Sequence, residues 1–211
     1  MAHHSNSGAQ TQADRVALIT GASRGLGYTV AEFLARQRWT LILTARHEVP
    51  LLEAVKRLQA TGASISAVPG DVTQDRHRRD LGDAVRRIGR LDLLVNNASE
   101  LGASPFPALV DYPLEVLRRV FEVNVVAPLA LIRACLPVLQ KSRGLVVNVT
   151  SDAARGAYPG WGGYGSSKAA LELVSKTLAN ELRDAGVGVV AVDPGDLRTQ
   201  MHQDAFPGQD I

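Results

Sequence analysis

Six short runs of aliphatic residues recur along the 211-residue chain, and each is separated from the next by a longer amphipathic or polar segment. The runs occupy residues 16–20, 41–44, 65–68, 91–95, 145–150 and 187–192. They read as continuous hydrophobic stretches, which is typical of strands that are buried on both faces of a parallel sheet. Strands that alternate with helices indicate the same architecture. We therefore expect one α/β domain, a doubly wound parallel sheet with helices on both faces.

The segments between the runs predict the covering helices, since their apolar residues recur at helical spacing. The expected helices span residues 26–37, 50–58, 74–88, 114–140 and 164–182. The fourth of them should break or kink near Pro128 and Pro137, because proline removes a helical hydrogen bond. The basic run Arg76-His77-Arg78-Arg79 is flanked by acidic residues and is interpreted as a solvated helix face.

Composition excludes several classes of function. The net charge of +2, with acids and bases mixed along the chain, gives no reason to expect nucleic acid or an anionic membrane as a partner. No apolar stretch of membrane-spanning length and no signal peptide is recognised, so a cytoplasmic protein is the default expectation. The single cysteine, Cys135, lies in an apolar run and is interpreted as a buried hydrophobic residue. No metal site is expected, because His3 and His4 alone are too few ligands.

A glycine-rich turn, Thr20-Gly21-Ala22-Ser23-Arg24-Gly25-Leu26-Gly27, joins the first predicted strand to the first predicted helix. In that context glycines let the backbone turn tightly and approach a pyrophosphate, which the helix N-terminus attracts. A plain glycine-rich turn is the alternative, but the strand–turn–helix arrangement favours dinucleotide binding. The candidate cofactor contacts in this turn are Gly21, Ser23, Arg24, Gly25, Leu26 and Gly27.

Polar residues also follow the third and fourth predicted strands, as Asp71-Val72 and Asn96-Asn97-Ala98-Ser99. These positions are the carboxyl ends of parallel strands, where open α/β sheets bind ligands. Taken alone, the two asparagines would be interpreted as capping a turn.

Tyr164 and Lys168 lie four residues apart at the start of the last predicted helix, so their side chains share one face. A phenol beside an ammonium group can become acidic enough to exchange protons near neutral pH. Ser151, after the fifth predicted strand, can direct its hydroxyl to the same place. By itself the pair would be interpreted as two residues on a helix surface.

The spacing Gly-x-x-x-Gly-x-Gly, together with Tyr164-x-x-x-Lys168, resembles the classical short-chain dehydrogenase/reductase family, from about residue 15 to residue 199. The resemblance implies that Tyr164 is the general acid/base and that Lys168 lowers its pKa and holds the nicotinamide ribose. Ser151 would hydrogen-bond the substrate oxygen, and Asn124 would hold a water molecule in a proton relay. Free tyrosine titrates near pH ~10, so this role requires its pKa to fall by roughly three units.

The same resemblance implies further cofactor contacts. Asp71 and Val72 would contact the adenine, and Asn97 and Ala98 would line the adenosine ribose. The segment of residues 193–199 would meet the nicotinamide, with Pro194, Gly195 and Thr199 as its contacts. The family usually has glycine where this chain has Ser99.

The choice of cofactor follows from charge at the end of the second predicted strand. An NAD-selective site places a carboxylate there to bind the ribose hydroxyls. This chain instead has Arg46, with no acidic residue until Glu48, and Arg24 can approach the same 2′-phosphate from the glycine-rich turn. Both arginines could be solvated surface residues, but two at these positions favour NADP.

The hypothesis is therefore an NADP(H)-dependent oxidoreductase with a Rossmann-type domain at residues 15–199, acting on a small-molecule carbonyl or alcohol. Residues 1–14 are expected to form a disordered arm, and residues 200–211 to begin a mobile substrate loop. The family's final helix and strand are not recognised, so the working protein is expected to exceed 211 residues. A homodimer or homotetramer is expected, paired through residues 114–140 and 164–182.

Two alternatives stay open. A catalytically silent dinucleotide-binding sensor or assembly subunit is supported by the unrecognised final segment and opposed by the presence of all four catalytic residue types. A sugar-nucleotide epimerase is a weaker option, because its usual glycine spacing differs.

Overall fold

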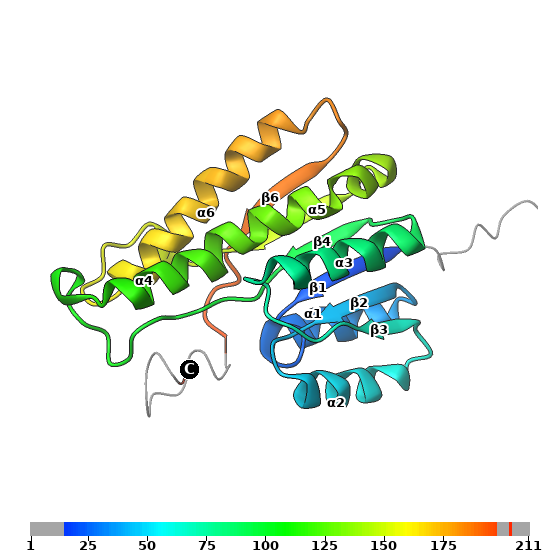
Figure 1. Ribbon diagram of the computed structural model, residues 1–211, viewed down its shortest axis with the longest axis horizontal. Coiled ribbons are helices and arrows are strands. Elements are labelled where there is room, and N and C mark those ends of the chain that lie inside the picture. Colours follow the sequence, from blue (N-terminus) through cyan, green and yellow to red (C-terminus); the bar gives the residue numbers. More distant parts are fainter. Residues whose placement is uncertain (1–14, 198–202, 204–211) are drawn as a thin grey trace, which may run out of the picture.

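The computed structural model describes residues 15–197 and residue 203 (Figure 1). The arm expected at residues 1–14, the candidate contact Thr199 and nearly all of the loop expected at residues 200–211 lie outside the described residues.

The described residues contain one six-stranded parallel sheet, as the aliphatic runs predict. Its strands are β1 (Val16–Thr20), β2 (Thr40–Thr44), β3 (Ile65–Ala67), β4 (Leu93–Asn96), β5 (Leu145–Val149) and β6 (Gly188–Val192). The strand order is β3-β2-β1-β4-β5-β6. After β3 the chain returns to the other side of β1, where β4 pairs with it, so the strand order reverses between β1 and β4. Doubly wound sheets bind their ligands in the crevice at this point.

Helices cover both faces of the sheet (Figure 1). They are α1 (Gly25–Arg36), α2 (Glu48–Gln59), α3 (Asp75–Ile88), α4 (Leu114–Phe121), α5 (Ala127–Ser142) and α6 (Gly162–Glu181). Successive side chains of a strand point to opposite faces. Accordingly, Val16 and Leu18 of β1 pack with α3 and α5, whereas Ala17 and Ile19 pack with α1 and α2. This two-faced core confirms the expected fold class.

The helix expected at residues 114–140 changes type just before Pro128. A π-helical segment, η3 (Glu122–Val126), joins α4 to α5. Of the break or kink expected near Pro137, the break is wrong, because α5 continues through that residue to Ser142. Pro137 lies on the exposed side of α5, where water can satisfy the carbonyl that the proline leaves without a donor.

The expectation that no apolar stretch reaches membrane-spanning length is wrong, because the continuous helical stretch Leu114–Ser142 is long and apolar enough to cross a membrane by length and composition alone. Half of its most apolar window is buried within the protein. Leu131, Ile132, Cys135 and Leu139 of this stretch belong to the core beneath the sheet, as is usual for a core helix. Burial raises the pKa of the Cys135 thiol to about 12, in keeping with its interpretation as a hydrophobic residue.

The basic run on α3 is not a uniformly solvated face, because His77 and Arg78 are buried. The His77 ring hydrogen-bonds the Thr44 hydroxyl at 2.8 Å, and burial lowers the pKa of His77. Arg78 donates to the carbonyl oxygen of Val72 at 2.7 Å, and its guanidinium lies 3.7 Å from the Glu122 carboxylate. These two residues connect α3 to the end of β2 and to the loop that follows β3.

Candidate active site

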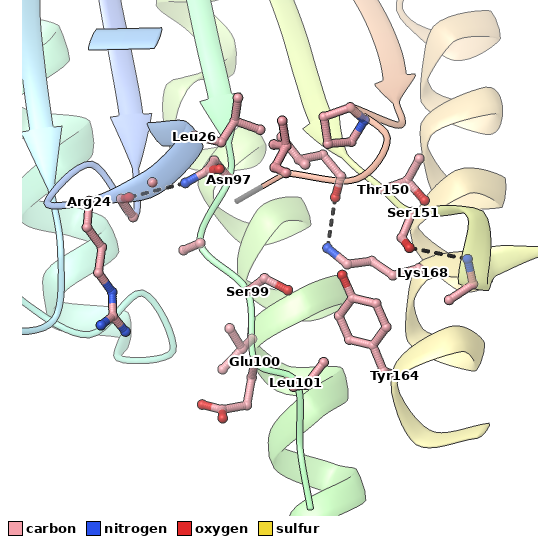
Figure 2. A pocket seen from close by; sticks show the side chains of 18 of the residues that line it. Arg24, Leu26, Asn97, Ser99, Glu100, Leu101, Thr150, Ser151, Tyr164 and Lys168 are labelled. Carbon is pink, nitrogen blue, oxygen red and sulfur yellow. Dashed lines mark hydrogen bonds between the residues drawn. The ribbon is translucent and has the colours of Figure 1, made fainter. Parts of the chain in front are cut away.

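A cavity of about 1170 Å³ opens at the carboxyl ends of the strands. The glycine-rich turn, the loops after β2 to β6 and the start of α6 all contribute to its lining (Figure 2). The sequence-predicted residues on its wall are Gly21, Ser23, Arg24, Gly25, Leu26, Arg46, Asp71, Val72, Asn97, Ala98, Ser151, Tyr164, Lys168, Pro194 and Gly195. Gly27 and Asn124 are not on the wall, although both contact residues that are.

The glycine-rich turn is held against the end of β4 by Asn97. The side-chain amide of Asn97 donates to the carbonyl oxygens of Thr20 and Gly21 at 2.9 and 3.2 Å. The backbone N–H groups of Asn97 and Ala98 donate in turn to the Thr20 hydroxyl at 3.0 and 2.9 Å. These bonds fix the position of the α1 N-terminus at the mouth of the cavity.

Two glycines of this turn are required by geometry. Gly21 has a φ of +65°, in the left-handed region that side chains disfavour. A Cβ atom at Gly27 would lie 2.4 Å from the Gly21 carbonyl oxygen, so only glycine allows α1 to pack so close to the turn. Gly27 therefore determines the position of the turn relative to α1 without itself lining the cavity.

Tyr164, Lys168 and Ser151 converge at the other end of the cavity (Figure 2). Tyr164 and Lys168 are in the first two turns of α6, as their spacing predicts, and both are buried. The Lys168 ammonium lies 5.4 Å from the centroid of the Tyr164 ring and donates to the Val149 carbonyl oxygen at 2.8 Å. The end of β5 thus positions both the lysine and, two residues later, Ser151.

The titration of these groups differs from the expectation that Lys168 lowers the pKa of Tyr164. Burial raises the pKa of Tyr164 to about 12. The hydroxyls of Ser99 and Ser151 act to lower this pKa, and the nearby carboxylates of Asp152 and Asp193 act to raise it. Burial also lowers the pKa of Lys168 to about 8. In this arrangement the tyrosine is neutral at neutral pH, and the lysine is mostly cationic.

Ser151 is held by its neighbours in the short helix that follows β5. Its hydroxyl donates to the Asp152 carboxylate at 2.9 Å and accepts from the Ala153 backbone N–H at 3.2 Å. The hydroxyl must turn away from Asp152 before it can donate to a substrate oxygen. Sequence reasoning did not identify Asp152, which lines the cavity beside Ser151.

Asn124 is buried in the π-helical segment and connects three parts of the site. Its amide group donates to the Glu100 carbonyl oxygen and to the Ser167 hydroxyl, each at 2.9 Å. Its side-chain oxygen accepts from the Glu100 backbone N–H at 2.8 Å and from the Ser99 hydroxyl at 3.2 Å. Asn124 therefore fixes the loop after β4 relative to α6.

The cavity wall near Asp71 contains a residue that sequence reasoning missed. Arg119 of α4 donates to the Asp71 carboxylate at 2.7 Å and to the Thr73 hydroxyl at 2.8 Å. Burial alone would raise the pKa of Asp71, but hydrogen bonds from Thr73 and Arg119 outweigh it and lower this pKa to about 2. Asp71 is consequently an ionised acceptor on a segment that Arg78 also anchors through Val72.

The remaining wall beside Tyr164 is aromatic. Tyr158 and Trp161 line the cavity there, together with Ala153. The Trp161 ring meets the Tyr164 ring edge-on, with centroids 5.9 Å apart, and packs against Phe106 at 4.6 Å.

Comparison with known proteins agrees with this geometry. The family described as short chain dehydrogenase matches residues 15–210. The diacetyl reductase [(S)-acetoin forming] of Staphylococcus epidermidis is 34% identical over 190 residues, which cover 89% of this chain and 73% of that protein. Dehydrogenase/reductase SDR family member 4 of Bos taurus is 35% identical over 190 residues, which cover 88% and 67%.

Solved structures superpose closely on this chain. A short chain dehydrogenase from Shigella flexneri complexed with NADP gives a TM-score of 0.87 at 32% identity, covering 93% of this chain and 83% of that one. An alcohol dehydrogenase from Thermococcus sibiricus complexed with 5-hydroxy-NADP gives 0.84 at 30% identity, covering 93% and 82%. The match extends over the sheet, the glycine-rich turn and α6, and the chain belongs to the classical short-chain dehydrogenase/reductase family.

Proposed function

We propose that the protein is an NADP(H)-dependent oxidoreductase that transfers a hydride between the nicotinamide and a small-molecule carbonyl or alcohol. The observation that carries the proposal is the convergence of Tyr164, Lys168 and Ser151 at one end of a cavity whose other end holds Arg24 (Figure 2). Arg46, which follows β2, also lies on the cavity wall.

The donor set of the cavity suits a dinucleotide phosphate. The α1 N-terminus presents backbone N–H groups and the positive end of a helix dipole to a pyrophosphate. Arg24 and Arg46 offer cationic forks to a 2′-phosphate, and Asp71 and Val72 would meet the adenine. Lys168, Pro194 and Gly195 lie on the wall where the nicotinamide half would bind.

When bound, the cofactor supplies the hydride, and the protein supplies orientation and a proton. Tyr164 is neutral below its raised pKa and so carries the proton that it donates to the carbonyl oxygen during reduction. Ser151, turned from Asp152, donates a hydrogen bond to the same oxygen as negative charge develops there. Lys168 orients the ribose and, as a cation, favours the tyrosinate that proton transfer leaves behind.

An assay of NADPH oxidation with a panel of ketones and aldehydes tests the reaction. Turnover with at least one carbonyl compound, lost in Tyr164→Phe, is the expected result. Tight NADPH binding with no turnover on any compound would contradict the proposal and favour the silent dinucleotide-binding sensor or assembly subunit.

Cofactor choice is tested by titrating NADPH and NADH into the wild type, Arg46→Asp and the double variant Arg46→Asp/Arg24→Ala. Charge-assisted contacts of about 1.5–3 kcal/mol each predict a preference for NADPH of about tenfold or more. Equal affinities in the wild type, or a preference that survives in the double variant, would contradict the assignment of these arginines.

We further propose a cytoplasmic homodimer or homotetramer that pairs through α4, α5 and α6. Leu114 of α4, Leu173 of α6 and Val126 of η3, just before α5, are large and exposed, which supports an apolar contact there. Light scattering of the active protein measures the assembly, and an active monomer at micromolar concentration would contradict it. Detection in the membrane fraction of gently lysed cells would contradict the compartment.

A further inference from the structure

The carboxylate of Glu100 lies beside the arginine that the proposed cofactor site assigns to the 2′-phosphate. Glu100 Oε2 is 3.6 Å from Arg46 Nη1, and both side chains line the cavity. Arg46 follows β2 and Glu100 follows β4, so the ion pair connects two loops on opposite sides of the central strand β1. The glycine-rich turn that follows β1 therefore lies between these two loops.

The backbone of Glu100 is anchored, so its carboxylate projects from a defined point. Its N–H donates to Asn124 Oδ1 at 2.8 Å, and its carbonyl oxygen accepts from Asn124 Nδ2 at 2.9 Å. Asn124 is itself held to α6 through Ser167. Figure 2 shows the Glu100 side chain extending away from Tyr164, toward the side of the cavity where Arg24 lies.

We propose that Glu100 determines how strongly the protein prefers NADPH to NADH, an inference that rests on the proposed cofactor site. The guanidinium of Arg46 can offer its hydrogen-bonding fork either to the Glu100 carboxylate or to a 2′-phosphate. A phosphate that binds there displaces the carboxylate and then lies close to a like charge. Glu100 therefore weakens 2′-phosphate binding.

The same carboxylate has the opposite effect on a cofactor that lacks the phosphate. A ribose 2′-hydroxyl can donate to a carboxylate, which is how NAD-selective sites in doubly wound folds use an acidic residue. Here that residue would come from the loop after β4 instead of the end of β2. Glu100 thus keeps NADH usable and limits the advantage that Arg24 and Arg46 give to NADPH.

Two half-cofactors isolate the effect from the chemistry. Adenosine 2′,5′-bisphosphate and 5′-AMP differ by the 2′-phosphate alone and bind whether or not the protein turns over. Calorimetric titration of each into the wild type, Glu100→Gln and Glu100→Ala gives the ratio of the two affinities. Glu53→Gln is the matched control, because it removes one carboxylate from the exposed face of α2, off the cavity wall.

Removal of a partly exposed charge contact changes affinity by up to roughly fivefold. Glu100→Gln and Glu100→Ala should therefore tighten the bisphosphate by about that factor and leave AMP equal or weaker. The gain should shrink at high salt, because the interaction is between charges. Glu53→Gln should leave the affinity ratio within twofold of the wild type.

A ratio unchanged in both Glu100 variants, or an equal gain in Glu53→Gln, would overturn the inference while leaving the cofactor site intact. Failure of every variant to bind either nucleotide would overturn both the inference and the proposed site.

Discussion

Lys168 is a cation held in the interior of the protein, so its charge should lower the stability of the fold. Its side chain is 2% exposed, and its ammonium donates to the Val149 carbonyl oxygen. Burial lowers its pKa from the ordinary 10.5 to about 8. We expect Lys168→Met, which keeps the length and apolar character of the side chain and removes its charge, to stabilise the protein at neutral pH.

The size of the effect follows from the two pKa values. A folded-state pKa of about 8 against 10.5 corresponds to about 3 kcal/mol of destabilisation where the lysine is charged in both states. The lost hydrogen bond to Val149 offsets about 1 kcal/mol of the gain in the variant. Lys168→Met should therefore be more stable than the wild type by about 2 kcal/mol at pH 7.

The pH dependence has a definite sign. The folded-state pKa lies below the unfolded one, so the folded wild type binds fewer protons and gains stability as the pH rises from about 8 to 10.5. Between pH 7 and pH 10 the advantage of Lys168→Met should shrink by about 2.5 kcal/mol, nearly to zero. Other groups titrate in both proteins, so they largely cancel in the difference.

Urea unfolding of both proteins at pH 7 and pH 10 measures this difference. Lys176→Met is the matched control: Lys176 is on the same helix, but its side chain is 73% exposed. That variant should change the unfolding free energy by less than about 0.5 kcal/mol at either pH. A wild type more stable than Lys168→Met at pH 7, or a gap that does not change with pH, would refute the reasoning.

Two further predictions concern the proposed chemistry. Tyr164→Phe keeps the ring and removes the proton, so turnover should fall by roughly 10²–10⁴-fold while NADPH affinity stays within about twofold; near-normal turnover with every substrate would contradict the acid/base role. Ser99→Gly, which installs the residue usual in the family, removes a hydroxyl that lowers the pKa of Tyr164. The pH profile of alcohol oxidation should then move toward higher pH, and an unshifted profile would show that Ser99 does not act on the tyrosine.

The sheet and the turn could be predicted from sequence because their signals are local. Each aliphatic run became a strand within two residues of its expected bounds. The glycine-rich turn and the Tyr164–Lys168 spacing each depend on a few consecutive residues and on one known geometry, strand–turn–helix or a helix face. Such features require no knowledge of the distant chain.

The residues that sequence reasoning missed reach the site through tertiary packing. Arg119 and Glu100 belong to a helix and a loop whose path over the cavity no periodicity encodes. The helix at residues 114–142 likewise becomes π-helical where Asn124 bonds to Glu100 and Ser167. The irregularity that was expected from the prolines therefore coincides with contacts to residues outside the helix. The burial of Arg78 was missed for the same reason, since its partners Val72 and Glu122 lie outside α3.

A buried polar chain, also absent from the sequence prediction, connects the sheet to the helix that carries Tyr164. Asn96 of β4 donates to Asn148 of β5, and Asn148 donates to the Ser175 hydroxyl of α6, both at 2.8 Å. Ser175 donates in turn to the Leu171 carbonyl oxygen at 2.7 Å. These hydrogen bonds thus fix the position of α6 relative to the sheet, and with it the position of Tyr164.

Ser175→Ala should therefore weaken the fold, because it leaves a donor of the fully buried Asn148 amide without a partner. A buried unsatisfied donor costs about 1–3 kcal/mol, which urea unfolding resolves. Ser166→Ala is the matched control on the same helix, since the exposed Ser166 hydroxyl donates to a helix carbonyl and its loss should change stability by less than about 0.5 kcal/mol. Equal stability losses in the two variants would show that this polar chain does not help to hold α6, because of the two serines only Ser175 bonds to Asn148 of the sheet.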